Sequence, residues 1–375
     1  MLKGFYLTLM MGPVVAEPVP QPVTDALMSV QVTTTDGQRS GFQLTFAVSK
    51  KSLINTTLLP AGFFDPLVRV VIVATVNGVP DVLMDGVITH QEITPSSVPG
   101  QSTLTITGED LTVLMGLVDL SGIPYPDISD ALIVEIVLAK YALFGVIPLA
   151  IPGLLTDILN IAERIAIQRG TDLDYVQLLA KENSYVFYLI PGPAPGASVA
   201  YWGPRIKVGV PQPALSINMD ADTNVESLSF SFDGMSGEQL LLYILDPVTG
   251  EVDLLIPVPD FSILQPPLAL KSAPKLKVNV VEGTSKLTLV KAALLGLSEA
   301  SSASQAVKGN GQLDVVRYGH VLKARQLVGV RGVGLAYDGL YYVESVTHDI
   351  KRGEYKQSFT LSRDGLLPLT PTVVP

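Results

Sequence analysis

The first third of the chain alternates apolar and polar residues with the period of two that is typical of β-strands. Asp36–Gly37 and Asn77–Gly78 separate consecutive segments of this kind and have the composition of hairpin turns. Short strands joined by such turns predict a β-sandwich or a small β-barrel. The predicted strands are Phe5–Met11, Ser29–Thr35, Gly41–Val48, Leu67–Val76, Val82–Glu92 and Ser102–Thr107.

The middle of the chain changes to the spacing of helices. The predicted helices are Ile128–Phe144, Leu154–Gln168 and Asp172–Ala180. Thr171 is a suitable N-cap for the third helix, and the acidic Asp172 and Asp174 favour its positive end. A predicted strand, Tyr185–Ile190, is followed by the proline–glycine loop Pro191–Gly196. This part of the chain is therefore predicted to be an α+β unit.

β-structure returns in the last third of the chain. The predicted strands are Val225–Phe232, Val328–Val330, Tyr341–His348 and Tyr355–Ser362. Between the first two, Glu238–Ala273 is predicted to contain a hairpin around Asp246–Gly250. Lys286–Val307 is predicted to be a helix that stops at Gly309–Gly311.

One pattern occurs twice in the sequence. Val87–Glu92 followed by Ser102–Ile106 is similar to Ser345–Ile350 followed by Gln357–Leu361. Each copy is a strand, a polar loop and a second alternating strand that ends near acidic residues and glycine, and both first strands carry a histidine after a threonine. The repeat predicts two copies of one β-barrel separated by inserted material. A chance match between short segments is the alternative.

The composition is unusually apolar for a chain of 375 residues, with 47% hydrophobic residues, 16% charged residues and a mean hydropathy of +0.40. A membrane protein and a subunit that buries apolar surface against partners are the two explanations. The longest uncharged candidate span, Tyr141–Thr156, contains two glycines and two prolines and cannot be one continuous helix. Burial in an assembly is the preferred interpretation, and no membrane insertion is expected.

The N-terminal 16 residues allow two interpretations. Lys3 followed by an apolar run to Ala16 is similar to a secretory signal. A first strand that ends at Gly12–Pro13 is the favoured alternative, because no small-residue cleavage pair is clear.

Charge and cysteine content exclude several classes of function. The formal net charge of −10 makes stable nucleic-acid binding a poor prediction, since that affinity comes mainly from Lys and Arg at phosphates. The absence of cysteine excludes disulfides, thiolate metal sites and cysteine nucleophiles.

Several segments carry a resemblance to a known family through their order and spacing. These segments are Arg39–Phe46, Val82–Thr89, Thr103–Leu111, Gly170–Ala180, Tyr185–Tyr188, Arg317–Gly319, Val328–Gly332 and Tyr341–His348. By these segments the chain resembles the late control D family, the tail hub proteins of contractile phages and related injection systems, which includes the N-terminal hub part of type VI secretion VgrG spikes.

The resemblance implies a mainly β fold with an α+β outer domain. Each chain is expected to hold two tube-type β-barrel domains, and three chains are expected to form a homotrimeric ring with pseudo-sixfold symmetry. The expected domains are 1–125 for the first barrel, 126–215 for the α+β outer domain, 216–235 with 312–375 for the second barrel, and 236–311 for an inserted outer segment with a hairpin and a helix.

The function implied is that of a structural baseplate hub, which adapts a trimeric spike to a hexameric inner tube and nucleates tube assembly. Because no β-helical spike follows before Pro375, a separate spike protein is expected as a partner. An inner tube or tube-initiator protein and baseplate wedge proteins are the other expected partners. The protein is expected to assemble in the cytoplasm and to become part of a virion tail or an injection particle. The alternative is a cell-wall- or carbohydrate-degrading tail enzyme.

No catalytic, cofactor-binding or metal site is predicted, and no cofactor is expected. His90, His320 and His348 lack the spacing of metal ligands. Glu109 and Asp110 are neighbours at a strand end and should point to opposite sides, so capping of the following turn is the preferred role. Asp172 and Asp174 are likewise interpreted as helix-capping residues, and Asp81 and Asp85 as turn residues.

Three further patterns are interpreted as structural. Gly329–Gly334 is glycine-rich, but a strand rather than a helix is predicted after it, which favours a tight turn over a phosphate loop. Ser272–Lys275 matches a Ser-x-x-Lys pattern, yet Pro274 prevents the helix on which that dyad works. Trp202, the only tryptophan, is predicted to be buried, with a partner contact as the alternative.

Overall fold

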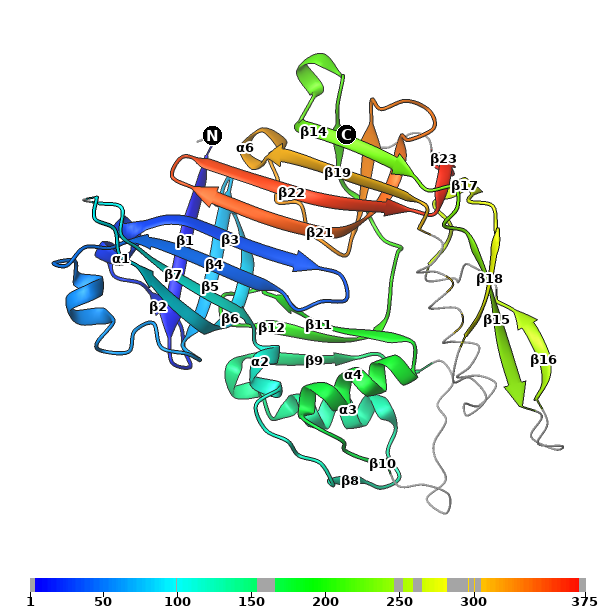
Figure 1. The fold of residues 1–375 in the computed structure, drawn as a ribbon, viewed down its shortest axis with the longest axis horizontal. Coiled ribbons are helices and arrows are strands. Elements are labelled where there is room, and N and C mark those ends of the chain that lie inside the picture. The colour runs from blue at the N-terminus through cyan, green and yellow to red at the C-terminus, as the bar shows by residue number, and fades with distance from the viewer. Residues whose placement is uncertain are drawn as a thin grey trace.

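Most of the chain's strands join edge to edge in one 13-stranded sheet, with a smaller α+β layer below it (Figure 1). The computed structural model describes residues 4–98, 100–153, 166–245, 252–258, 265–281 and 305–370, together with positions 296 and 300. The fold is mainly β, as predicted.

The N-terminal part of the sheet contains the strands predicted in the first third of the chain. Alternation of core and outward residues places Leu44 and Phe46 inside, where both are fully buried. In spatial order the strands are β3 (Leu27–Thr35), β4 (Gly41–Ala47), β7 (Thr103–Asp110), β6 (Val79–Thr94), β5 (Arg69–Val76), β1 (Phe5–Gly12) and the short β2 (Glu17–Pro18). All these neighbours pair antiparallel, and the short helix α1 (Gln21–Ala26) and the π-turn η1 (Ile54–Leu58) connect them.

The C-terminal part of the sheet repeats the order of four of these strands. It runs β14 (Val225–Phe232), β19 (Val307–Asp314), β22 (Glu354–Arg363) and β21 (Gly339–Lys351), and β21 then pairs antiparallel with β3. Smaller elements complete this part: β13 (Gln212–Ser216), η3 (Asp220–Asp222), α6 (Val315–Tyr318), β20 (Leu327–Arg331) and β23 (Gly365–Pro368), which pairs with β17 (Ala269–Ser272).

A single hydrophobic core runs behind both parts of the sheet. It includes Val32 and Phe46 from the N-terminal part and Val346, Tyr355 and Leu361 from the C-terminal part. The two parts therefore pack as one body.

The α+β layer has its own core around the helices α3 (Asp130–Ala139) and α4 (Asp172–Glu182). Its three-stranded sheet has the order β11 (Tyr185–Pro191), β12 (Ser198–Pro204) and β9 (Val146–Ala150). The remaining elements are α2 (Thr112–Met115), β8 (Pro124–Tyr125), η2 (Ala142–Phe144) and β10 (Ala166–Ile167).

The helix predicted over Asp172–Ala180 is confirmed, and Thr171 caps it through a reciprocal pair of bonds with Asp174. The helix predicted over Ile128–Phe144 forms but ends at Ala139, because the chain turns back at Gly145, whose φ is 72°. Leu154–Gln168 lies largely outside the described residues. Its last residues are strand β10 rather than helix, because they pair with β8.

The predicted hairpin is present as β15 (Glu238–Leu245) and β16 (Val252–Pro257), and β18 (Lys277–Val281) joins β15 in parallel. The helix predicted over Lys286–Val307 lies mostly outside the described residues, and its expected stop at Gly309–Gly311 is wrong. Both glycines lie inside β19, where a Cβ would meet the rings of Phe230 at 2.6 Å and Phe359 at 2.5 Å. They leave room for aromatic packing.

Candidate functional site

One face of the large sheet is covered by hydroxyl and amide side chains. In the row from β14 to β6, alternate residues point into the core and the others point outward. We call the outward surface the polar face. Its uncharged members include Ser227, Ser229, Ser231, Asn310, Gln312, Ser345, Thr347, Ser358, Thr360, Gln31, Thr33, Gln43, Thr45, Thr94, Thr103, Thr105 and Thr107.

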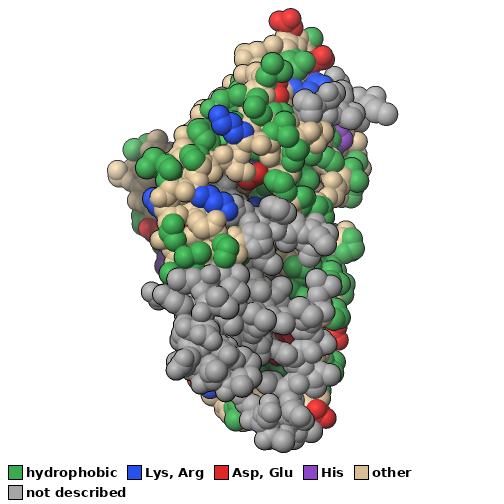
Figure 2. Space-filling view, turned by 90° about the vertical axis from the view of Figure 1, so that its right-hand side faces the viewer, with side chains coloured by type: hydrophobic (Ala, Val, Ile, Leu, Met, Phe, Trp, Pro, Cys, Tyr) green, Lys and Arg blue, Asp and Glu red, His purple; other side chains and the backbone are tan. Residues whose placement is uncertain are grey.

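Charges on the polar face are few and partly neutralised. The Lys356 ammonium lies 3.0 Å from the Glu226 carboxylate, and the Arg39 guanidinium lies 3.0 Å from that of Glu109. Sparse charge is a wider property of the molecule. On the side shown in Figure 2, hydrophobic and uncharged atoms dominate the described surface, and charged side chains occur as small separate spots.

The joint between β21 and β3 connects the two repeated halves of the row. Its register runs from Ser345 opposite Thr35 to Lys351 opposite Ser29. On the polar face the hydroxyls of Thr33 and Thr347 lie 3.1 Å apart, and the Gln31 amide donates to the Asp349 carboxylate at 3.1 Å. Main-chain pairing, side-chain bonds and a shared core therefore all hold this joint.

Two open edges end the row. β14 pairs with β19 alone among the described strands. The pairing of β6 with β5 ends at Val87, so residues 89–94, all exposed, pair only with β7 among the described strands. Unpaired edges of this kind present main-chain donors and acceptors that another strand can use. Ile93 points toward the core side of its edge, yet 47% of its surface is exposed.

Matching bulges show that the two halves correspond in register. β6 is irregular between Ile88 and His90, and β21 is irregular between Val343 and Ser345. A second pair of irregularities lies between Leu27 and Ser29 in β3 and between Val225 and Ser227 in β14. β6 thus corresponds to β21, and β14 corresponds to β3. The open edge of β6 therefore corresponds to the edge of β21 in the β21–β3 joint, and the open edge of β14 corresponds to the edge of β3.

The same register corrects the equivalence of the two histidines in the repeat. His90 corresponds to Ser345 on the polar face, and His348 corresponds to Ile93 on the core side. A bulge shifts the alternation by one residue, so similar sequence letters lie on opposite faces. The His348 Nδ1 lies 2.8 Å from the Tyr355 hydroxyl, and complete burial lowers the pKa of His348 to about 3.

The three histidines lie in different elements: His90 on β6, His320 after α6 and His348 on β21. The His320 ring packs edge-on against Tyr318. Within the described residues, no three His, Cys, Asp or Glu side chains gather closely enough to hold a metal ion.

The first pair of acidic neighbours divides as alternation predicts. Glu109 lies on the exposed polar face. Asp110 is buried and accepts bonds from the main chain of Ser40 at 2.9 Å and of Thr112 at 3.0 Å, capping the turn into α2. Burial raises the pKa of Asp110, and the bonds from Thr112 and Ser40 oppose that rise.

The second acidic pair is divided by the first turn of α4. Asp174 belongs to the capping pair with Thr171, whose hydrogen bonds lower the pKa of Asp174. The Asp172 carboxylate is buried and accepts from Lys140 at 3.0 Å, Tyr141 at 2.8 Å and Gln168 at 2.7 Å. Burial, followed by this hydrogen bond to Asp172, raises the pKa of the Tyr141 phenol.

A buried ion pair between Arg69 and Asp85 was not predicted. Arg69 begins β5, and Asp81 and Asp85 both lie within β6, so the interpretation of these two acids as turn residues is wrong. Two parallel bonds of 2.7 Å join the Arg69 guanidinium to the Asp85 carboxylate. The available signal was an arginine between valines in an otherwise apolar strand.

This ion pair ties the α+β layer to the large sheet. The Ser198 hydroxyl of β12 donates to Asp85 at 3.0 Å. Arg69 also donates to the carbonyl oxygens of Phe144 at 2.7 Å and Gly196 at 3.0 Å. The additional partners Ser198, Phe144 and Gly196 all belong to the α+β layer, whereas Arg69 and Asp85 belong to the large sheet. Asp81 instead forms an ion pair with Lys323 at 2.6 Å.

The glycine-rich segment, the Ser-x-x-Lys pattern and Trp202 all occupy structural positions. Gly332 and Gly334 have positive φ in the turn after β20, as a tight turn requires. Ser272 ends strand β17, so no helix carries the Ser-x-x-Lys pattern. Trp202 is 1% exposed, and its indole N–H donates to the Val176 carbonyl at 3.3 Å. The prediction that Trp202 packs inside the α+β unit is confirmed.

No helix in the described part of the chain combines the length and apolar character that crossing a bilayer would need. By sequence, the chain matches no protein-family model and no curated protein.

By structure, the chain is similar to several tail proteins. The tail protein from Neisseria meningitidis MC58 is 13% identical, with a TM-score of 0.63 over 97% of this chain and 98% of that one. The 43 kDa tail protein of prophage MuSo2 from Shewanella oneidensis is 15% identical, with a TM-score of 0.60 over 97% of this chain and 100% of that one.

A similar fold occurs in secretion systems. The E. coli c3393 protein, a component of the type VI secretion system, is 11% identical, with a TM-score of 0.52 over 93% of this chain and 77% of that one. The chain therefore has the fold of these phage tail proteins and of this secretion-system component. The resemblance seen in the sequence is confirmed at the level of the fold.

Proposed function

We propose that the protein is a structural baseplate hub of a contractile phage tail or contractile injection system. In this role three copies close into a ring that adapts a trimeric spike to a hexameric inner tube and nucleates assembly of that tube. The single observation that carries the proposal is the β21–β3 joint. Within one chain, this joint shows how one repeated half pairs with the next.

The two open edges extend the same joint between chains. If β6 of one copy pairs with β14 of the next as β21 pairs with β3, each chain contributes two similar halves. Three chains then give six such halves around one axis, which matches threefold symmetry on one side and sixfold on the other. Closure also removes both unpaired edges and covers Ile93.

The polar face supports an inner wall. Hydroxyl and amide side chains stay hydrated, and the charges on this face are partly neutralised by ion pairs, so a channel lined by them would hold its contents weakly. The domain division expected from the sequence, with barrels at 1–125 and at 216–235 with 312–375, is retained in this proposal. The α+β unit and the inserted segment would then face baseplate wedge proteins.

A separate spike protein and an inner tube or tube-initiator protein would occupy the two ends of the ring. Assembly in the cytoplasm followed by incorporation into a tail or injection particle belongs to the same proposal. The alternative, a cell-wall- or carbohydrate-degrading enzyme, requires two carboxylates facing one cleft. The acidic pairs singled out in the sequence are instead divided between capping and ion pairing.

A cross-link between copies tests the ring. The register of the β21–β3 joint places Thr94 of one copy opposite Ser229 of the next, as Asp349 lies opposite Gln31. The chain has no cysteine, so the double variant Thr94→Cys/Ser229→Cys offers one defined disulfide. Oxidation should give a closed product with three times the chain mass of 40.0 kDa.

Thr94→Cys/Leu228→Cys is the matched control, because residue 228 lies on the other face of β14 and should not cross-link. Equal cross-linking of both pairs, or a protein that stays monomeric when oxidised, would reject the proposed joint.

A further inference from the structure

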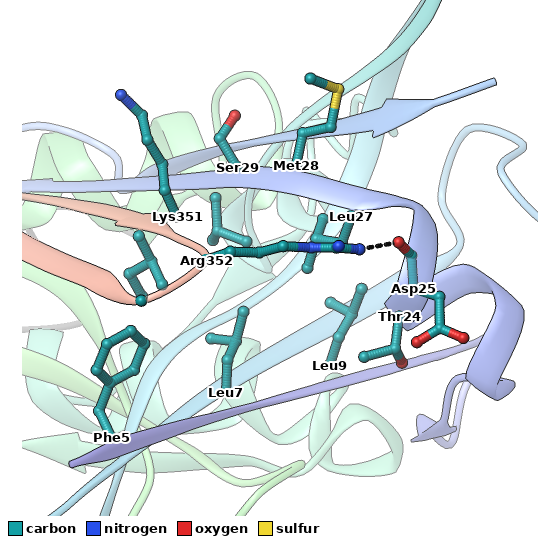
Figure 3. A pocket seen from close by; sticks show the side chains of 13 residues that line it. Phe5, Leu7, Leu9, Thr24, Asp25, Leu27, Met28, Ser29, Lys351 and Arg352 are labelled. Atoms are coloured by element: carbon teal, nitrogen blue, oxygen red, sulfur yellow. Dashed lines mark hydrogen bonds between the residues drawn. The ribbon is translucent and has the colours of Figure 1, made fainter. Parts of the chain in front are cut away.

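A groove lies between β1 and β3, beside the hairpin that joins β21 to β22 (Figure 3). Its volume is about 400 Å³. Phe5, Leu7 and Leu9 line one wall, and Leu27 and Val30 contribute from the side of β3. The sheet order leaves β1 and β3 unpaired with each other, and the opening between them is apolar.

Among the described residues, the edge of β1 that faces the groove is unpaired except near its C-terminal end. β1 pairs with β5 over its whole length but with β2 only at Met10 and Met11. Just beyond, the Val19 amide donates to the Leu9 carbonyl at 3.1 Å, which shows that the odd residues direct their main-chain groups to this side. By the alternation of an antiparallel ladder, Phe5 and Leu7 present an N–H and a C=O to the groove as well.

The side chains on β1 fit an extended occupant. Phe5, Leu7 and Leu9 alternate along the strand and reach into the groove, whereas Tyr6 points to the other face and is 66% exposed. An added strand would place its own alternate residues against them, two residues apart. A compact or helical ligand would leave the free main-chain groups of β1 unpaired.

The rim of the groove carries more positive than negative charge. Lys351 and Arg352 line it from the β21–β22 hairpin. The Arg352 guanidinium reaches across the groove and donates to the main-chain oxygen of Asp25, not to its carboxylate (Figure 3). The Asp25 carboxylate accepts from the Gln21 amide at 2.8 Å. No ion pair involves Lys351 or Arg352 among the described residues, so no carboxylate neutralises either cation, although Arg352 already donates to the Asp25 main-chain oxygen.

We propose that this groove binds an extended segment of a different protein, one that adds a strand to the free edge of β1. The segment carries apolar residues at alternate positions and an acidic residue that meets Lys351 and Arg352. This surface lies apart from the open edges of β6 and β14, so it provides a contact beyond those that would close the ring. A partner that stacks on this end of the molecule would reach it.

A defined peptide tests the proposal on the full-length protein. The probe is a fluorescein-labelled hexapeptide, acetyl-Glu-Val-Thr-Val-Thr-Val-amide, whose binding is measured by fluorescence anisotropy. We expect saturable binding that weakens at least fivefold when Lys replaces Glu in the probe. Methylation of alternate peptide nitrogens should abolish binding, because it removes the main-chain donors that a strand needs. This comparison uses unaltered protein and so does not depend on the folding of a variant.

Variants locate the site. Leu7→Asn should weaken binding about tenfold, whereas the matched control Tyr6→Asn, on the opposite face of β1, should change it less than twofold. Absence of saturable binding at 1 mM peptide, undiminished binding of the methylated peptide, or equal effects of the two variants would overturn the proposal.

A competing occupant gives a distinct result. If a second copy of this chain fills the groove, self-association will block the site at high protein concentration. The apparent affinity for the peptide will then weaken as the protein concentration rises, and that outcome would also overturn the proposal. The cross-link between residues 94 and 229 should form in the Leu7→Asn variant as in the unaltered chain. The groove and the ring can therefore fail independently.

Discussion

His348 illustrates how position on a strand decides the chemistry of a residue. On the core side of β21 it is buried against the Tyr355 hydroxyl and held near the side chain of Gln357. His90, at a similar place in the sequence, stands on the polar face of an open edge. Burial disfavours the charged ring of His348 and lowers its pKa to about 3.

Burial of His348 makes the stability of the fold depend on pH. The unfolded chain binds a proton at this site below about pH 6.5, whereas the folded chain does so only near pH 3. Stability should therefore fall as the pH decreases from 6.5 toward 3, by at most about 1.4 kcal/mol per pH unit from this group. Urea unfolding of the unaltered protein and of His348→Gln, measured at several pH values, checks this. A slope between pH 6 and 4 that is no shallower in His348→Gln would show that other groups cause it.

At the scale of the element, β21 is the strand on which most of the architecture depends. It pairs with β22 on one side and with β3 on the other, and β20 pairs with its beginning. Residues 192–196, in contrast, lie in the connection between β11 and β12 and not in a strand that is paired on both sides. These two segments should respond differently to the same substitution.

Proline separates the two cases. Val346→Pro removes a main-chain donor and introduces a ring inside a strand paired on both sides, which should cost about 3 kcal/mol or more. Ala194→Pro lies in the loop and should cost less than about 1 kcal/mol. Chemical unfolding gives both values, and counting assembled particles extends the comparison to the assembly. If Val346→Pro assembles normally and Ala194→Pro does not, the proposal that β21 forms the wall of the ring and that the α+β unit lies outside it would be rejected.

At the scale of the whole molecule, the Arg69–Asp85 pair fixes the α+β layer to the large sheet. Both side chains are almost fully buried, at 4% and 0% exposed. Such a pair contributes little net stability, but removal of one partner leaves a buried charge without compensation. Arg69→Met should therefore cost about 3–5 kcal/mol, and the second change Asp85→Leu should recover much of the loss.

The control for this prediction is Arg39→Met, which breaks the exposed pair with Glu109, where the side chains are 45% and 41% exposed. Its cost should stay below about 1 kcal/mol because solvent screens the pair. Guanidinium unfolding measures both variants. Equal costs would mean that Arg69 does not hold the two layers together.

The sequence alone determined the parts of this structure that depend on neighbours along the chain. Alternation of residues identified the main strands, because one face of each strand must be buried. Thr171 and the acids after it marked the start of α4, because a helix end is satisfied by side chains within one turn. The ordered segments around Gly170–Ala180 and Tyr341–His348 also led to the family whose fold the structure has.

Tertiary structure decided what depends on residues far apart in the chain. The pairing of β21 with β3 leaves no signal within either strand. The arginine between valines marked Arg69 as unusual, but only the fold shows that Asp85 is its partner. Gly309 and Gly311 have the local pattern of a helix stop, although they lie inside β19. The faces of His90 and His348 depend on bulges, and a bulge is visible only when two strands are paired. Alternation determines that a strand has two faces, but only its partners determine which residue lies on which.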